Sequence, residues 1–148
     1  MSNVSNNINI SMPNSNRNFC RFDGVKVLYY LNKKENAIPL LEDTLKNTDD
    51  EKTVCESLYI ADRLIENGVK GVDKMYPVFS RFNNTESPNI QTFLAGIYRK
   101  TKVPDAFGPL CSMLIKNSIT PKNEQIPFDP NEEIGGAILS YISDRFRQ

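Results

Sequence analysis

The sequence of 148 residues contains no histidine. Histidine is the commonest general base near neutral pH and a frequent metal ligand. Its absence excludes Ser-His-Asp and Cys-His catalysis and every zinc site that includes a histidine. Tryptophan is absent as well, which removes the aromatic side chain that binds cationic ligands best. We therefore expect a protein that is not an enzyme, with no catalytic residue, no metal site and no cofactor.

Cysteine is scarce, and the three that occur, Cys20, Cys55 and Cys111, are odd in number and widely spaced, with no C-x-x-C pair. This pattern favours reduced thiols over disulfides or zinc ligands. Cys55 and Cys111 fall on or beside apolar stripes, where a free cysteine behaves as a small hydrophobic residue. The seven glycines form neither G-x-x-x-x-G-K nor G-x-G-x-x-G, so no phosphate-binding loop is expected.

Neither sign of charge is in excess, because Lys plus Arg and Asp plus Glu each number 18. Nothing in this balance favours nucleic acid or an anionic membrane as a partner. The sequence also lacks an apolar run of about 18 residues for a membrane span and the apolar segment of a secretory signal. We expect a soluble, cytoplasmic protein.

The first 18 residues, MSNVSNNINISMPNSNRN, contain seven Asn, four Ser and no aromatic residue. Such a segment cannot bury enough apolar surface to offset the entropy of ordering. It is predicted to be a disordered arm over 1–18, followed by one folded domain over 19–148.

Three prolines recur in the same setting, in the stretches AIPLLEDTL (37–45), MYPVFSRFN (75–83) and FGPLCSMLI (107–115). In each stretch, apolar residues lie two before, one after and two after the proline, and another follows five or six after it. The residues between are mostly polar. This is the 3.6-residue period of a half-buried helix, repeated three times.

The three prolines are expected to differ in depth within their helices. Pro39 falls in the first turn, with Asn36 as a plausible cap, where the missing N–H costs little. Pro77 and Pro109 are predicted about one turn deeper, where a proline kinks the helix.

Each proline-bearing helix is followed by a second helical pattern with a recognisable start. Thr48 and Glu51 have the spacing of a capping box, and Ser87-Pro88 places a cap residue before a first-turn proline. The chain is therefore predicted to be all-α. The expected helices are an N-terminal one over 25–34 and three pairs, 36–47 with 50–67, 71–83 with 88–101, and 104–118 with 130–147.

The pairs resemble the HEAT-repeat family of armadillo-like superhelical proteins. The resemblance rests on a first helix with an internal proline, AIPLLEDTLKN, followed by an acidic turn and a cation before an apolar helix, TDDEKTVCESL. It covers roughly 36–147. It implies a short right-handed α-solenoid of about three HEAT-like helix pairs with an N-terminal helix.

The resemblance also implies that the second helices line a concave face on which a partner protein binds. Aligning the second helices places Arg63 and Arg99 at equivalent positions, as a two-rung basic ladder flanked by Tyr59, Lys100 and Lys102. Arginine suits this role because its planar fork binds carboxylates bidentately. An ordinary solvated helix face is the alternative. The predicted partner-binding residues are Tyr59, Arg63, Arg99 and Lys102.

The leading hypothesis is a non-catalytic module or adaptor that binds another, unidentified protein. Two alternatives stay open. Some HEAT-like proteins are enzymes, either DNA glycosylases or chromophore lyases, although a glycosylase would need a basic groove with aromatic residues. The chain could also be a structural subunit or terminal cap of a larger assembly, since about three repeats are near the minimum for a stable stack.

Overall fold

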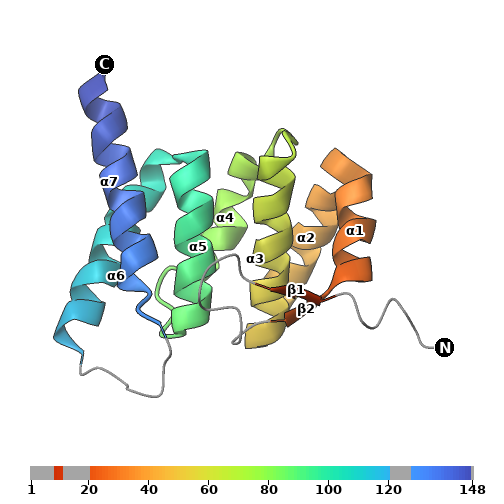
Figure 1. Ribbon diagram of the computed structural model, residues 1–148, viewed down its shortest axis with the longest axis horizontal. Coiled ribbons are helices and arrows are strands. Elements are labelled where there is room, and N and C mark those ends of the chain that lie inside the picture. Colours follow the sequence, from red (N-terminus) through yellow and green to blue (C-terminus); the bar gives the residue numbers. More distant parts are fainter. Residues whose placement is uncertain (1–8, 12–20, 121–127, 148) are drawn as a thin grey trace.

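The computed structural model describes residues 9–11, 21–120 and 128–147, which are almost entirely helical (Figure 1). The α-helices are α1 (Gly24–Lys33), α2 (Ala37–Asn47), α3 (Glu51–Glu66), α4 (Tyr76–Phe79), α5 (Pro88–Thr101), α6 (Phe107–Ile119) and α7 (Asn131–Arg147). Four 3₁₀ turns are interspersed, η2 (Lys34–Asn36), η3 (Val72–Met75), η4 (Ser80–Phe82) and η5 (Pro104–Ala106). Two short antiparallel strands, β1 (Asn9–Ser11) and β2 (Arg21–Asp23), precede α1.

The helices form two layers. Helices α1, α3, α5 and α7 lie side by side in chain order as the first layer, with each packed on the next (Figure 1). Helices α2, α4 and α6 lie behind them as the second layer, in which α2 contacts α4. Across the layers α2 packs on α3, and α6 packs on α7. No helix in the described ranges is long and apolar enough to cross a membrane.

The predicted all-α class and the helix ranges are confirmed, with one difference. The expected helix over 71–83 is divided into η3, α4 and η4, so only four of its residues are α-helical. Gly71 begins this segment with a φ of 102°, a left-handed conformation that glycine adopts at little cost.

The three recurrent prolines share one local structure. A 3₁₀ turn precedes each proline-bearing α-helix, and the proline lies at its second or third residue: Pro39 in α2, Pro77 in α4 and Pro109 in α6. The prediction that Pro77 and Pro109 lie a turn deeper and kink their helices is therefore wrong. Each proline has no N–H to donate, and an α-helix has no acceptor for that group in its first turn.

The second helices begin at side-chain caps, although one cap differs from the prediction. Asp50, rather than Thr48, is the N-cap of α3, and its Oδ2 accepts from the backbone N–H of Thr53 at 2.9 Å. Thr48 instead accepts from the N–H of Asp50 at 3.1 Å. The predicted cap of α5 is confirmed, because Ser87 Oγ accepts from the N–H of Ile90 at 3.2 Å.

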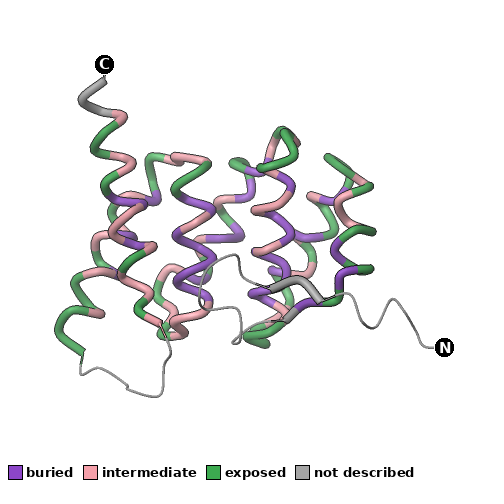
Figure 2. Tube along the Cα trace, in the orientation of Figure 1, coloured by how far each residue is buried: buried purple, intermediate pink, exposed green. Residues whose placement is uncertain are grey.

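The buried side chains concentrate on α3 and α5 (Figure 2). These helices have a first-layer neighbour on both sides and the second layer behind them, so most of their circumference is covered. Within the second layer, Arg81 links η4 to the end of α2. It donates to the backbone oxygen of Leu45 and pairs with Asp49 at 3.2 Å. The largest fully buried side chains are Phe22, Leu41, Leu45, Leu58, Ile60, Leu64, Met75, Phe79, Leu94, Ile97, Tyr98 and Leu110.

The strand pair was not expected from the sequence. Within the arm predicted over 1–18, the structure describes only Asn9–Ser11, and these residues form β1. The register pairs Ile10 with Phe22. The other residues of the arm lie outside the described ranges, as does most of the loop over 119–129.

Candidate binding face

The predicted site residues all belong to the first layer. Tyr59 and Arg63 lie on α3, Arg99 lies on α5, and Lys102 is the C-cap of α5 in a left-handed conformation with φ 56°. The structure therefore places them on the two neighbouring helices α3 and α5. Whether they bind a partner stays a prediction.

The cations on α5 are paired within the chain. Arg99 lies 3.8 Å from Glu133 of α7, and Lys102 pairs with Asp144 of the same helix. Lys100 bridges to two carboxylates of α3, Asp62 at 2.7 Å and Glu66 at 2.6 Å. The cations of the predicted basic ladder thus alternate with carboxylates across the first layer, so this face carries mixed charge.

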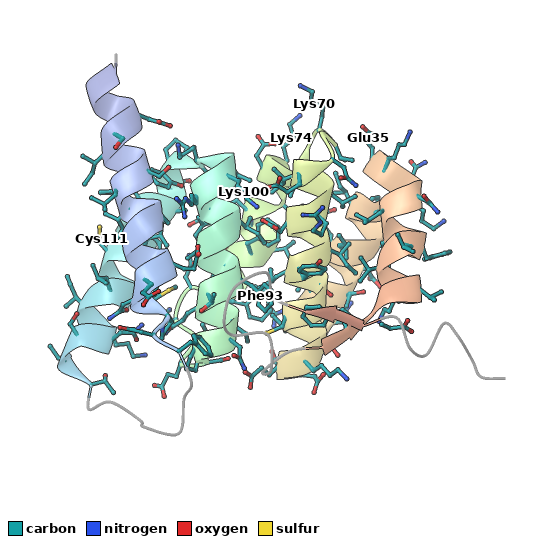
Figure 3. All side chains as sticks on the ribbon, viewed as in Figure 1. Glu35, Lys70, Lys74, Phe93, Lys100 and Cys111 are labelled. Carbon is teal, nitrogen blue, oxygen red and sulfur yellow. The ribbon has the colours of Figure 1, made fainter. Side chains whose placement is uncertain are left out.

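The Lys100 interaction changes the titration of its partner. The hydrogen bond from Lys100 and its positive charge hold the pKa of Glu66 below the ordinary value, with a smaller contribution from the charge of Arg63. The pKa of Lys100 is raised because these two carboxylates outweigh the cost of its partial burial. The bridge joins α3 to α5 near the upper end of α5 in Figure 3.

An aromatic cluster lies on the same layer and consists of Phe22, Tyr59 and Phe93. The ring centroids of Phe22 and Tyr59 are 5.2 Å apart, those of Phe22 and Phe93 are 5.8 Å apart, and those of Tyr59 and Phe93 are 6.4 Å apart. These separations are typical of attractive ring contacts. Phe22 is only 1% exposed. Partial burial raises the pKa of the Tyr59 hydroxyl.

Phe22 reaches this cluster from β2, which lies against the lower part of α3 in Figure 1. Asp23 follows it and caps α1, since its Oδ1 accepts from the N–H of Val25 at 3.0 Å. Beside the cluster, Lys26 of α1 pairs with Glu56 of α3 at 2.7 Å, and Glu56 is 8% exposed. The start of α1 and its ion pair therefore hold the preceding strand over the first layer.

Sequence reasoning identified Tyr59 in this cluster but not Phe22 or Phe93. Phe93 lies beside the apolar stripe that Ile90, Leu94 and Ile97 form, and Phe22 lies just before the helix predicted over 25–34. Asp23 was a usable signal for Phe22 in the sequence. As an N-cap it fixes the residue at which α1 begins, and so the direction from which Phe22 enters that helix.

The described cysteines are packed rather than exposed. Cys55 is buried in α3, and Cys111 is partly buried on the outer side of α6 (Figure 3). Cys20 lies outside the described residues. Among the residues that the structure describes, no group of three or more cysteine and carboxylate side chains is arranged to hold a metal ion.

The chain matches no family model, no curated protein and no solved structure. The resemblance to HEAT repeats therefore depends on the residues quoted for it and stays a prediction.

Proposed function

We propose that this chain is a non-catalytic protein-interaction module built as a short right-handed α-solenoid of HEAT-like helix pairs. Three features support the solenoid. The 3₁₀-turn, proline and α-helix sequence occurs three times, a capped second helix follows it at α3 and α5, and the second helices line one layer. Repeated units that contact only their neighbours are the defining feature of solenoid proteins.

The observation that carries the binding proposal is the position of Phe22. An extended segment of the chain, β2, lies on the first layer and buries an aromatic side chain between Tyr59 and Phe93. The face is therefore able to hold an extended peptide through an aromatic anchor. Burying a Phe side chain contributes about 2–3 kcal/mol, which is enough to select aromatic-containing segments.

We infer that a partner supplies an extended segment with an aromatic side chain, flanked by acidic residues. The aromatic residue takes the place of Phe22 beside Tyr59 and Phe93. Its acidic neighbours pair with Arg63, Arg99 and Lys102. Replacing the existing ion pairs within the chain by pairs with the partner costs little free energy, because a solvent-exposed ion pair contributes only about 0–1 kcal/mol.

A peptide of residues 9–23 with a fluorescent label tests this binding mode. The acceptor is the full chain carrying Phe22→Ala, which vacates the anchor position without removing the segment. Fluorescence anisotropy should show saturable binding to this variant and at least tenfold weaker binding to the wild type, whose own Phe22 competes. The same peptide with both Phe19→Ala and Phe22→Ala, which has no aromatic residue left, should not bind.

Two further variants separate the aromatic and charged contributions. Adding Tyr59→Ala to the Phe22→Ala chain should abolish peptide binding, whereas adding Asn84→Ala, an exposed position, should leave it unchanged. Peptides selected from a random display library on Phe22→Ala should contain an aromatic residue with acidic neighbours, and Arg63→Glu with Arg99→Glu should remove the acidic preference. Equal peptide binding to wild type and Phe22→Ala, or none to either, contradicts the proposal.

One observation favours the alternative of a subunit in a larger assembly, namely the distribution of exposed apolar residues. It leads to the inference that follows.

A further inference from the structure

The exposed large apolar side chains of the described residues lie only on the first two and the last two α-helices. Helices α3, α4 and α5 have none. Both layers contribute at each end, because α1 and α7 belong to the first layer and α2 and α6 to the second. The residues are Val25, Leu28, Tyr29, Leu40, Ile115, Ile119, Leu139 and Ile142.

On the terminal helices these side chains face away from the core. In α1, the exposed Val25 and Tyr29 lie about 160° around the helix from the buried Val27, and Leu28, which is 53% accessible, lies about 100° from it. In α7, Leu139 is 64% accessible, and the buried Ile134 and Ala137 lie on the side that packs on α5 and α6. The apolar residues therefore form an open surface at each end of the two layers, at opposite ends of the molecule in Figure 1.

Repeat stacks need polar residues on their outermost faces to stay as separate molecules. Here both outermost helices of the first layer carry exposed large apolar side chains. Helices α3 and α5 each bury one side against the first-layer helix before it and one side against the helix after it. Among the described residues, no helix packs on the outer side of α7 or on the outer side of α1. The outer side of α1 therefore fits the position after α7, and the outer side of α7 fits the position before α1.

The charges of the first layer also favour α1 as the helix that packs beside α7. Ion pairs join each first-layer helix to the next. Helices α1 and α5 contribute the cations of these pairs, and α3 and α7 contribute the carboxylates. A helix packed on the outer side of α7 should therefore be cationic. Helix α1 has no carboxylate, and of its two lysines Lys26 pairs with Glu56 of α3, which leaves Lys33 for such a contact. The pairs are Lys26 with Glu56, Lys100 with Asp62 and Glu66, Arg99 with Glu133, and Lys102 with Asp144.

We propose that α1 and α2 of one copy dock on α6 and α7 of a second copy, head to tail. The docking continues both layers across the junction, with α1 beside α7 and α2 beside α6. Because the two surfaces differ, the contact is heterologous and can repeat to give chains or a closed ring. None of the exposed apolar residues at the two ends belongs to the aromatic cluster of Phe22, Tyr59 and Phe93.

Sedimentation equilibrium of the full chain tests the proposal with one variant at each end. The average mass of the wild type should rise with concentration up to about 1 mM, where even a millimolar Kd populates the complex. Leu28→Glu and Leu139→Glu should each be monomeric. An equimolar mixture of the two should form a dimer, because Leu28→Glu retains an intact α6–α7 surface and Leu139→Glu retains an intact α1–α2 surface.

Asn84→Glu adds the same charge at an exposed position away from both ends and should associate like the wild type. Thermal unfolding followed by circular dichroism establishes that each variant is folded, and Leu28→Ser and Leu139→Ser replace any that is not. A wild-type mass that does not change with concentration overturns the proposal. So does continued association of Leu28→Glu, which would indicate contact between two α7 ends, or a mixture that stays monomeric.

Discussion

Arg99 of α5 lies over Gly136 of α7. A Cβ added at Gly136 would come within 3.3 Å of the Nη1 atom of Arg99 and 3.8 Å of its Cζ. The absent side chain lets the guanidinium cross to α7, where it lies 3.8 Å from Glu133. Of the three glycines Gly96, Gly135 and Gly136, only Gly136 marks such a close approach, because a Cβ at either of the others would meet nothing within 4 Å.

This difference predicts two distinct effects of alanine at the three glycines. Gly96→Ala and Gly135→Ala should each raise the free energy of unfolding by about 0.5–1 kcal/mol, since alanine loses less conformational entropy than glycine in a helix. Gly136→Ala should gain less, because Arg99 must move away from Glu133. Urea unfolding measures all three.

The arginine provides the control for the glycine series. In an Arg99→Ala background, the gain from Gly136→Ala should rise to that of Gly135→Ala. If Gly136→Ala gives the same gain with and without Arg99, the contact has no energetic consequence.

A partly buried chain of hydrogen bonds that begins at the buried Tyr98 leads to the second prediction. Tyr98 donates to Asn83 Oδ1 at 2.6 Å, Asn83 Nδ2 donates to the Tyr76 hydroxyl at 3.3 Å, and that hydroxyl donates to the backbone oxygen of Asp105 at 3.0 Å. Tyr98→Phe leaves the Asn83 acceptor without this donor and should lower the free energy of unfolding by about 1–3 kcal/mol. Asn83→Ala in the Tyr98→Phe chain should cost less than Asn83→Ala alone. Equal costs in the two backgrounds would show that the pair is not coupled.

Alkaline pH should destabilise the fold through Tyr141. Burial raises its pKa to about 12, and its hydroxyl donates to the backbone oxygen of Val103 at 2.6 Å. In the unfolded chain a tyrosine titrates near pH 10. From about pH 10 to 12 the folded chain keeps a proton that the unfolded chain has lost, so stability falls as the pH rises through this window.

Tyr141→Phe should make that decline shallower, as measured by urea unfolding at a series of pH values. Some decline should persist, because burial also raises the pKa of Tyr98. Tyr29→Phe, which changes an exposed ring, should leave the decline as in the wild type. A Tyr141→Phe curve identical to the wild type would be inconsistent with this assignment.

The helices could be predicted from the sequence because their signals are local. Apolar residues at helical spacing, the Ser87-Pro88 start and the recurrent prolines depend only on neighbours along the chain, and each was sufficient to place a helix. The depth of Pro77 and Pro109 could not be predicted, because a 3₁₀ turn and the first turn of an α-helix have nearly the same pattern of side chains.

The candidate face could be predicted only in part, because its contacts join distant segments. Arg99 and Lys102 were identified from the repeat register, but their pairing with Glu133 and Asp144 depends on how α7 packs on α5. The position of Phe22 depends on the pairing of β2 with β1, which joins residues about a dozen positions apart. The Asn-rich segment that forms β1 has no strand propensity that would indicate this pairing.

Ser87 supplies the last prediction, because its hydroxyl has two roles at the start of α5. It accepts from the N–H of Ile90 and donates to Glu51 Oε2 at 2.7 Å, so it both caps α5 and joins it to the first turn of α3. Ser87→Ala should lower the free energy of unfolding by about 1–2 kcal/mol, whereas Ser87→Asp should retain the cap but lose the donation to Glu51. Ser118→Ala is the matched control, since Ser118 donates only to the carbonyl of Leu114 in its own helix, and it should change stability by less than about 0.5 kcal/mol. An equal effect of Ser87→Ala and Ser118→Ala in urea unfolding would mean that the α3–α5 junction does not depend on this cap.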